Sequence, residues 1–60
     1  MTVILYDKDR ATYERVENVV QVNSGYMSGK GRQVKAWCCC TSGGEKCYKM
    51  ARYDIERVEA

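Results

Sequence analysis

Four cysteines are the residues with the widest range of chemistry in this chain of 60 residues. Cys38, Cys39 and Cys40 are consecutive, and Cys47 follows a short glycine-containing segment. Because neighbours along a β-strand point to opposite faces, Cys38 and Cys40 are expected to share one face. Zinc sites usually use Cys-x-x-Cys pairs or histidines, and the chain has neither. We therefore predict buried thiols and no cofactor; if a metal did bind, its ligands would be Cys38, Cys40 and Cys47.

The same thiols are poor candidates for catalysis. A nucleophilic cysteine needs a lowered pKa and normally an adjacent base, and the chain contains no histidine. Asp7 and Asp9 fall in a turn-like cluster, where aspartate is common for backbone reasons. A Cys40–Cys47 disulfide is an alternative use of the thiols, but disulfides are rare in a reducing compartment. The sequence predicts a protein that binds and is not an enzyme.

The length and the net charge of the chain restrict the kinds of protein that it can be. Residues 1–60 are expected to form one small domain, which at this length buries only about 60% of the surface of the unfolded chain. The net charge is +2, which is weaker than a dedicated duplex-binding module would carry. The apolar run Val3–Tyr6 is too short for a signal peptide or a membrane span. We therefore expect a cytoplasmic protein without membrane contact that forms a homo-oligomer, a dimer or higher, to complete its core.

Short runs of β-branched and aromatic residues predict an all-β, mostly antiparallel fold. Thr2–Tyr6 and Ala11–Val16 flank the turn-type cluster Asp7–Arg10, which is typical of a β-hairpin. Val19–Val22 indicates a short third strand, and the glycine-rich segment 23–32 indicates a loop.

The C-terminal tail favours a brief closing strand over Tyr53–Ala60, with a short helical turn over 54–60 as the alternative. Together the elements predict a small five-stranded barrel or β-roll, SH3-like or similar.

A central hairpin is the clearest local prediction. The strand-like runs Gln33–Thr41 and Lys46–Tyr53 flank Gly43-Gly44, a pair that suits a two-residue turn. That turn places Cys40 opposite Cys47. The ribbon is then apolar on both faces. We expect the small-residue face to pack inward, and its members are Val34, Ala36, Cys38, Cys40, Cys47 and Ala51. The other face would contact a second subunit, a partner or a ligand, and it carries Trp37, Cys39, Tyr48 and Met50.

The segment Tyr26–Trp37 is a second candidate surface. Its glycines let backbone N–H groups face an anion, although Gly31 follows Lys30 where a phosphate-binding Walker loop would have serine or threonine. Aromatic rings among cations suit stacking of a base and pairing of its phosphate. The candidate residues for this role are Tyr26, Lys30, Arg32 and Lys35. A solvated charged loop is the alternative interpretation.

The two ends of the chain follow a pattern of a strand, a Y-D-x-D-G turn, an E-N-V step and a closing I-x-x-[IV] segment, in Val3–Asp9 with Glu17-Asn18-Val19 and in Asp54–Glu59. In this pattern the chain resembles short proteins of phages and prophages. Arg10 replaces the turn glycine of that pattern. The resemblance implies a small β protein of a mobile element that docks on a host protein or sequesters a nucleotide signal.

The leading hypothesis is a small oligomeric binding protein of phage type, acting in the host cytoplasm and inhibiting a host defence protein by docking. One alternative is a binder of nucleotides or single-stranded nucleic acid through Tyr26–Trp37. A zinc-stabilised structural module is the other alternative.

Overall fold

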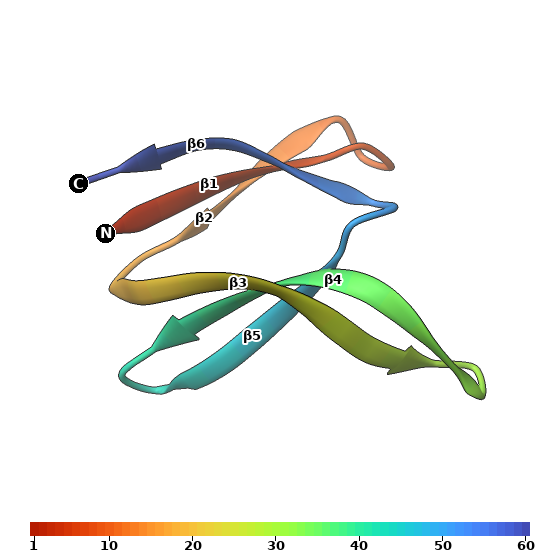
Figure 1. The fold of residues 1–60 in the computed structure, drawn as a ribbon. Helices are drawn as coiled ribbons and strands as arrows, with labels where there is room; N and C mark the ends of the chain where they lie inside the picture. Colours follow the sequence, from red (N-terminus) through yellow and green to blue (C-terminus); the bar gives the residue numbers. More distant parts are fainter.

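Six antiparallel strands form two three-stranded sheets (Figure 1). The computed structural model describes residues 1–60. The strands are β1 (Thr2–Asp7), β2 (Thr12–Val16), β3 (Val19–Gly29), β4 (Arg32–Thr41), β5 (Gly44–Lys49) and β6 (Tyr53–Glu59). The first sheet has the order β2-β1-β6, and the second sheet has the order β3-β4-β5. No helical segment of a length and hydropathy suited to crossing a bilayer is present.

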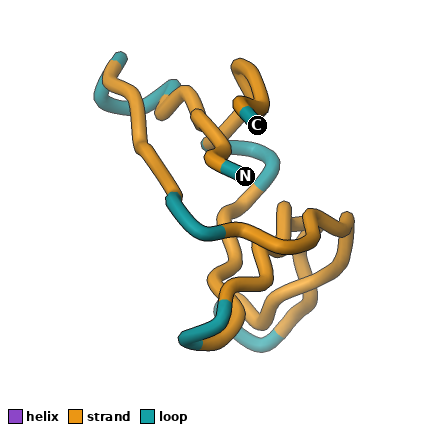
Figure 2. Tube along the Cα trace, turned by 90° about the vertical axis from the view of Figure 1, so that its left-hand side faces the viewer, coloured by secondary structure: helices purple, strands orange, loops and turns teal.

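The all-β, antiparallel class is confirmed, but the five-stranded closed barrel is wrong. The two sheets lie opposite each other and share only a short junction, where Met1 and Val19 exchange two hydrogen bonds of 2.8 Å (Figures 1 and 2). A sheet closes into a barrel only when its edge strands pair throughout, and here they do not. The C-terminal tail is strand β6, as favoured, and contains no helical turn.

The segment 23–32 is mostly strand and not the expected loop. Two long strands continue through it to a tight turn at Lys30 and Gly31, whose φ angles are 47° and 81°. Positive φ at both central residues is the requirement of a two-residue type I′ hairpin turn. The glycines of this segment therefore lie in strand β3 and in one tight turn, and not in a loop. The β3–β4 hairpin projects beyond the rest of the second sheet (Figure 1).

The β4–β5 hairpin has a different register from the prediction. Thr41 pairs with Gly44, so the turn is Ser42-Gly43, and the residue opposite Cys47 is Cys38 and not Cys40. Gly44 has the positive φ of this turn, 126°. The turn moves by one residue in both strands together, so each side chain keeps its predicted face while its partner changes.

The core lies between the sheets and is made by the face that we expected to be exposed. Its five buried residues are Val3, Leu5, Val16, Val19 and Cys39. The half-buried rings of Trp37 and Tyr48 pack against this cluster, so the face that we expected to contact a partner packs between the sheets. Ala36 and Cys38 of the small-residue face are also buried, so the ribbon does not have one inward and one exposed face. Large rings fill the gap of about 10 Å between facing sheets better than alanine and cysteine do.

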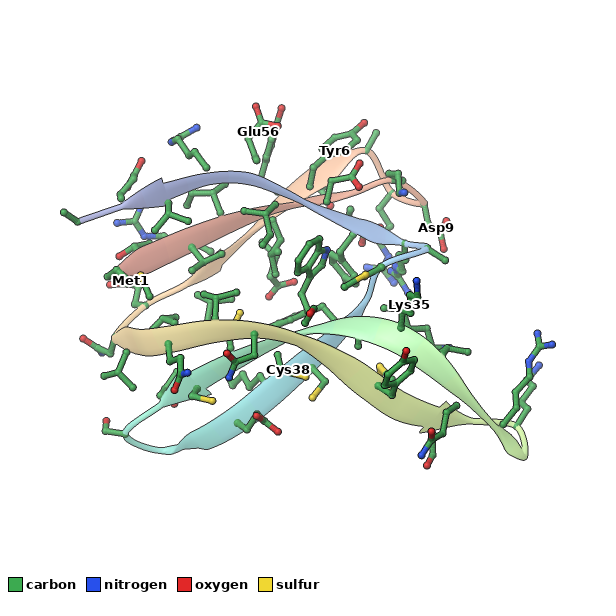
Figure 3. All side chains as sticks on the ribbon, in the orientation of Figure 1. Met1, Tyr6, Asp9, Lys35, Cys38 and Glu56 are labelled. Atoms are coloured by element: carbon green, nitrogen blue, oxygen red, sulfur yellow. The ribbon has the colours of Figure 1, made fainter.

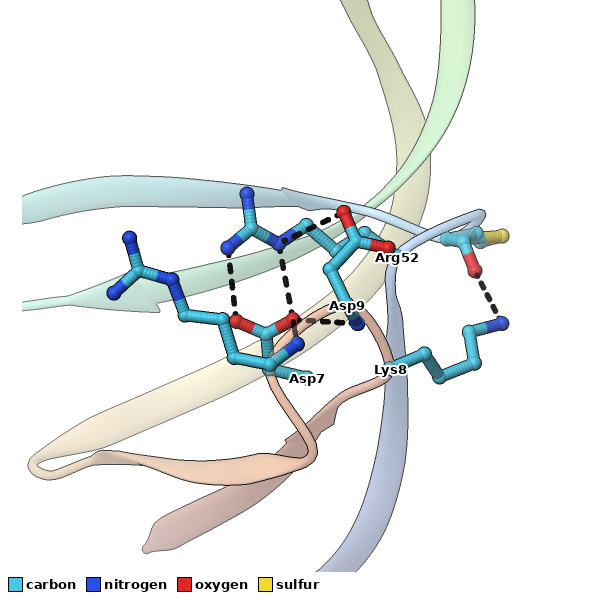
Figure 4. A network of polar contacts seen from close by, with 6 residues as sticks. Asp7, Lys8, Asp9 and Arg52 are labelled. Atoms are coloured by element: carbon cyan, nitrogen blue, oxygen red, sulfur yellow. Dashed lines mark hydrogen bonds and ion pairs between the residues drawn. The ribbon is translucent and has the colours of Figure 1, made fainter.

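An ion pair between the buried Asp7 and the half-buried Arg52 joins the two connections at one end of the sandwich (Figure 4). Arg52 donates to both carboxylate oxygens of Asp7, at 3.0 and 2.9 Å. The backbone N–H groups of Asp9 and Arg10 donate to the same carboxylate, which is 5% exposed. These hydrogen bonds, those from Arg52 above all, hold the pKa of Asp7 below its ordinary value. This arrangement fixes the β1–β2 turn against the β5–β6 connection.

Candidate functional site

The predicted contact face is largely inside the molecule. Cys39 is fully buried, and Trp37 donates its indole N–H to the backbone oxygen of Tyr53 at 3.2 Å. The ring of Tyr48 lies edge-on to that of Tyr53, with centroids 5.2 Å apart. Met50 follows β5 and remains half-buried. The premise of an exposed Trp37 and Tyr48 surface is therefore wrong, because the first sheet covers it.

Charge is divided unequally between the two sheets. Residues 19–50, which form the second sheet, contain five basic residues and one acidic residue, a net charge of +4. The rest of the chain contains five basic and seven acidic residues, a net charge of −2. The weak overall charge of +2 thus conceals a basic sheet facing an acidic one. The five basic residues of the second sheet are Lys30, Arg32, Lys35, Lys46 and Lys49.

Ion pairs sharpen this division. Every ion pair of the protein lies in the first sheet and its connections, where acids partner Lys8, Arg15, Arg52 and Arg57. None of the five basic side chains of the second sheet has an acidic partner within 4.0 Å. Their charges are exposed and available to an external anion.

The β3–β4 hairpin combines these cations with an exposed aromatic ring. Tyr26 and Lys35 are directly opposite each other in the ladder, and Tyr26 is 62% exposed. Lys30 occupies the turn and Arg32 begins the return strand. Because directly opposite residues share a face, Tyr26 and Lys35 lie side by side on one surface of the hairpin.

A shallow groove of about 290 Å³ lies beside this pair. It is lined by Ser24, Gly25, Tyr26, Lys35 and Met50. Figure 3 shows Lys35 near the end of the sandwich from which the hairpin extends. An apolar side chain, an exposed ring and a cation around one groove suit a flat ring that carries a negative group.

The structure therefore brings together two of the four predicted anion-binding residues. Tyr26 and Lys35 line the groove, while Lys30 and Arg32 lie at the hairpin tip. Ser24 and Met50 were not predicted as part of this site. Ser24 falls in the segment that the sequence predicts as a loop, and the sequence predicts Met50 on the face that contacts a partner. Only the observed strand pairing could have revealed them.

The cysteines divide between the two faces of the second sheet. Cys39 is in the core, whereas Cys38 and Cys47 lie on the outer face with their Sγ atoms 3.2 Å apart. The hydrogen bond with Cys47, together with burial, raises the pKa of Cys38 to about 11. The hydrogen bond with Glu45 raises the pKa of Cys40, and burial raises that of Cys39. These shifts run opposite to those of a nucleophilic thiolate.

Comparison with known proteins identifies no relative. No protein-family model, no curated protein and no solved structure matches this chain. The resemblance of the chain ends to phage proteins stays a prediction. Function must be inferred from the contacts and charges of the chain itself.

Proposed function

We propose that this protein binds single-stranded nucleic acid through the β3–β4 hairpin. The observation that carries the proposal is the concentration of unpaired positive charge on the second sheet, which has a net charge of +4 and no ion pair. Phosphate neutralisation by lysine and arginine supplies most of the affinity of non-specific nucleic-acid binding. Cations already paired with carboxylates contribute less, because binding must first break the pair.

Stacking on Tyr26 accounts for the preference for a single strand. The ring is mostly exposed beside a cation, and a base in a duplex has no free face to offer it. Each base stacked on an aromatic side chain contributes roughly 1–3 kcal/mol to binding of a single strand. The groove next to Tyr26 gives the ring room for such a contact.

The arrangement of the cations favours a strand over a single nucleotide. Lys35 lies three ladder steps from the Gly29–Arg32 pair, roughly 10 Å along the hairpin at 3.3 Å per residue. Lys30 and Arg32 at the tip and Lys35 beside Tyr26 thus spread positive charge along the hairpin, with Arg32 and Lys35 on opposite faces of the strand. Cations spread over this length fit successive phosphates, whereas one nucleotide would need converging cations.

The test is fluorescence anisotropy with a labelled oligothymidine of about 16 nucleotides, measured across a range of salt concentrations. We expect Lys30→Ala/Arg32→Ala to weaken binding and to reduce the magnitude of the salt slope by about 1.4, because each lost phosphate contact removes about 0.7. Tyr26→Ala should weaken binding by roughly 5- to 150-fold, the equivalent of one lost stacking contact, with the salt slope unchanged.

Arg15→Ala/Arg57→Ala is the matched control. It also removes two positive charges, but from exposed arginines that already contact glutamates on the first sheet. We expect this variant to bind nearly as tightly as the unaltered protein. Equal losses in both double variants would show that net charge alone governs binding, and absence of binding by the unaltered protein at low salt would refute the proposal.

A further inference from the structure

The outer face of the second sheet holds a cluster of thiols around one carboxylate. Cys38 and Cys47 are opposite each other in the β4–β5 ladder, and their Sγ atoms are 3.2 Å apart. The Glu45 carboxylate lies 3.3 Å from the Sγ of Cys40 through Oε2 and 3.9 Å from the Sγ of Cys47 through Oε1. Three sulfur atoms therefore surround one negatively charged group.

Strand register assembles this cluster. Cys40 pairs with Glu45 and Cys38 pairs with Cys47, so the cluster consists of two successive cross-strand pairs on one face. The glutamate side chain is long enough to reach back along β5 toward the neighbouring pair. The ligand atoms of Cys38, Glu45 and Cys47 all lie within 4.8 Å of one another, and Cys40 contacts the same carboxylate.

The position of Glu45 is a second, independent observation. Glu45 is the single acidic residue among residues 19–50, where five exposed lysines and arginines have no acidic partner. It forms no ion pair with any of them, although Lys46 is its neighbour in the chain. Its oxygen atoms face two thiols instead. The only negative charge of a basic sheet is thus placed among its sulfur atoms.

We propose that Cys38, Cys40, Cys47 and Glu45 form a binding site for a thiophilic divalent cation, Zn²⁺. Zinc binds four sulfur, nitrogen or oxygen ligands in tetrahedral geometry, whereas Mg²⁺ and Ca²⁺ prefer oxygen ligands alone. Each cysteine releases its proton to solvent when its sulfur binds the metal, and Glu45 binds as the carboxylate. The bound ion would link β4 to β5, two strands that no ion pair between a carboxylate and a lysine connects.

Side-chain rotations would complete the site, with the largest at Cys40, which is not among the ligand atoms already within 4.8 Å of one another. At a zinc–sulfur distance of about 2.3 Å, two tetrahedral ligands lie roughly 3.8 Å apart. The sulfur atoms of Cys38 and Cys47 would therefore separate by about half an ångström from their 3.2 Å contact. Cys47 and Cys40 are both partly exposed, so rotation about their side-chain bonds is open to them.

The experiment uses the reduced full-length chain, without nucleic acid, titrated with Co²⁺ and then with Zn²⁺. We expect thiolate-to-cobalt charge-transfer absorption and tetrahedral visible bands that saturate at one Co²⁺ per chain and disappear when Zn²⁺ is added. Cys47→Ser and Glu45→Gln should weaken Co²⁺ binding at least tenfold, since each removes a ligand. Glu45 is exposed, so its variant keeps the fold, which circular dichroism can verify.

Cys39→Ala is the control for thiol number, because this buried thiol lies on the opposite face of the sheet. Its cobalt spectrum and affinity should match those of the unaltered protein. Absence of charge-transfer absorption in the unaltered protein, or equal binding by Cys47→Ser, would overturn the proposal. So would a Cys38–Cys47 disulfide that persists in reductant, detected as a mass lower by two hydrogens.

Discussion

The two sheets of this protein differ in their charged side chains, since one sheet and its connections hold every ion pair and the other holds five unpaired cations. The first sheet contributes three of the five residues of the core, and all ion pairs belong to it and its connections. The second sheet contributes Val19 and Cys39 to the core, but its hairpin and its five cations face solvent or a shallow groove. The net charge of the whole chain and the spacing of its cysteines both look ordinary. The unequal distribution of charges and thiols between the two sheets becomes apparent only in the three-dimensional structure.

Replacement of Leu5 by alanine should have the largest effect, because Leu5 is fully buried at the centre of the core. A cavity at such a position costs about 2–5 kcal/mol, a large share of the stability of a 60-residue domain. Denaturant unfolding followed by circular dichroism measures the loss. Val20→Ala is the control, since Val20 is 74% exposed, and it should change stability by less than about 0.5 kcal/mol. Equal effects would contradict the location of the core.

Acidification should destabilise the protein through Asp7. Because the folded-state pKa of Asp7 is lowered, the stabilisation is present above the unfolded value of about 3.9 and is lost as pH falls through the folded value. Asp7→Asn should lower the melting temperature at pH 7 by roughly 5–10 °C and flatten its decline below about pH 5. Thermal melts from pH 7 to pH 2 measure both effects.

Asp54→Asn is the control for that experiment. Asp54 pairs with Lys8 at 3.5 Å, but both side chains are substantially exposed, and such pairs contribute little. Its melting curves should follow those of the unaltered protein across the pH range. A pH dependence that survives in Asp7→Asn would show that another carboxylate controls acid unfolding.

Adding two negative charges to the β3–β4 hairpin, which lowers its charge from +3 to +1, tests whether the hairpin binds nucleic acid. Ser28 and Gln33 are exposed and opposite each other, two ladder steps from Tyr26 and Lys35 toward the tip and therefore on the same face. Ser28→Glu/Gln33→Glu should weaken oligonucleotide binding by roughly tenfold, because two carboxylates then face the phosphates. Arg10→Glu changes the net charge equally but lies in the β1–β2 turn, and it should leave anisotropy titrations nearly unchanged. The reverse order of effects would place the interface on the first sheet.

The sequence predicts the strands better than their contacts. Alternation along 34–41 correctly sorts side chains between two faces, because that period is a property of the backbone. It does not say which face is covered, since both faces of this ribbon are apolar and the choice depends on the first sheet. Glu45 could not be assigned to the thiol cluster either, because a turn shifted by one residue changes its partner from Ser42 to Cys40.

The smallest predicted effect concerns the space that Gly25 leaves for Cys38. A Cβ atom at Gly25 would lie 3.2 Å from the Sγ of Cys38, which is tighter than ordinary contact. Gly25→Ala should therefore displace the sulfur and weaken Co²⁺ binding a few-fold. Gly29→Ala is the matched control, because its nearest neighbour, a Val34 methyl group, is 3.9 Å away. Neither glycine has a positive φ, so backbone strain is the same in both variants. Equal affinities would mean that Cys38 does not bind the metal from its observed position.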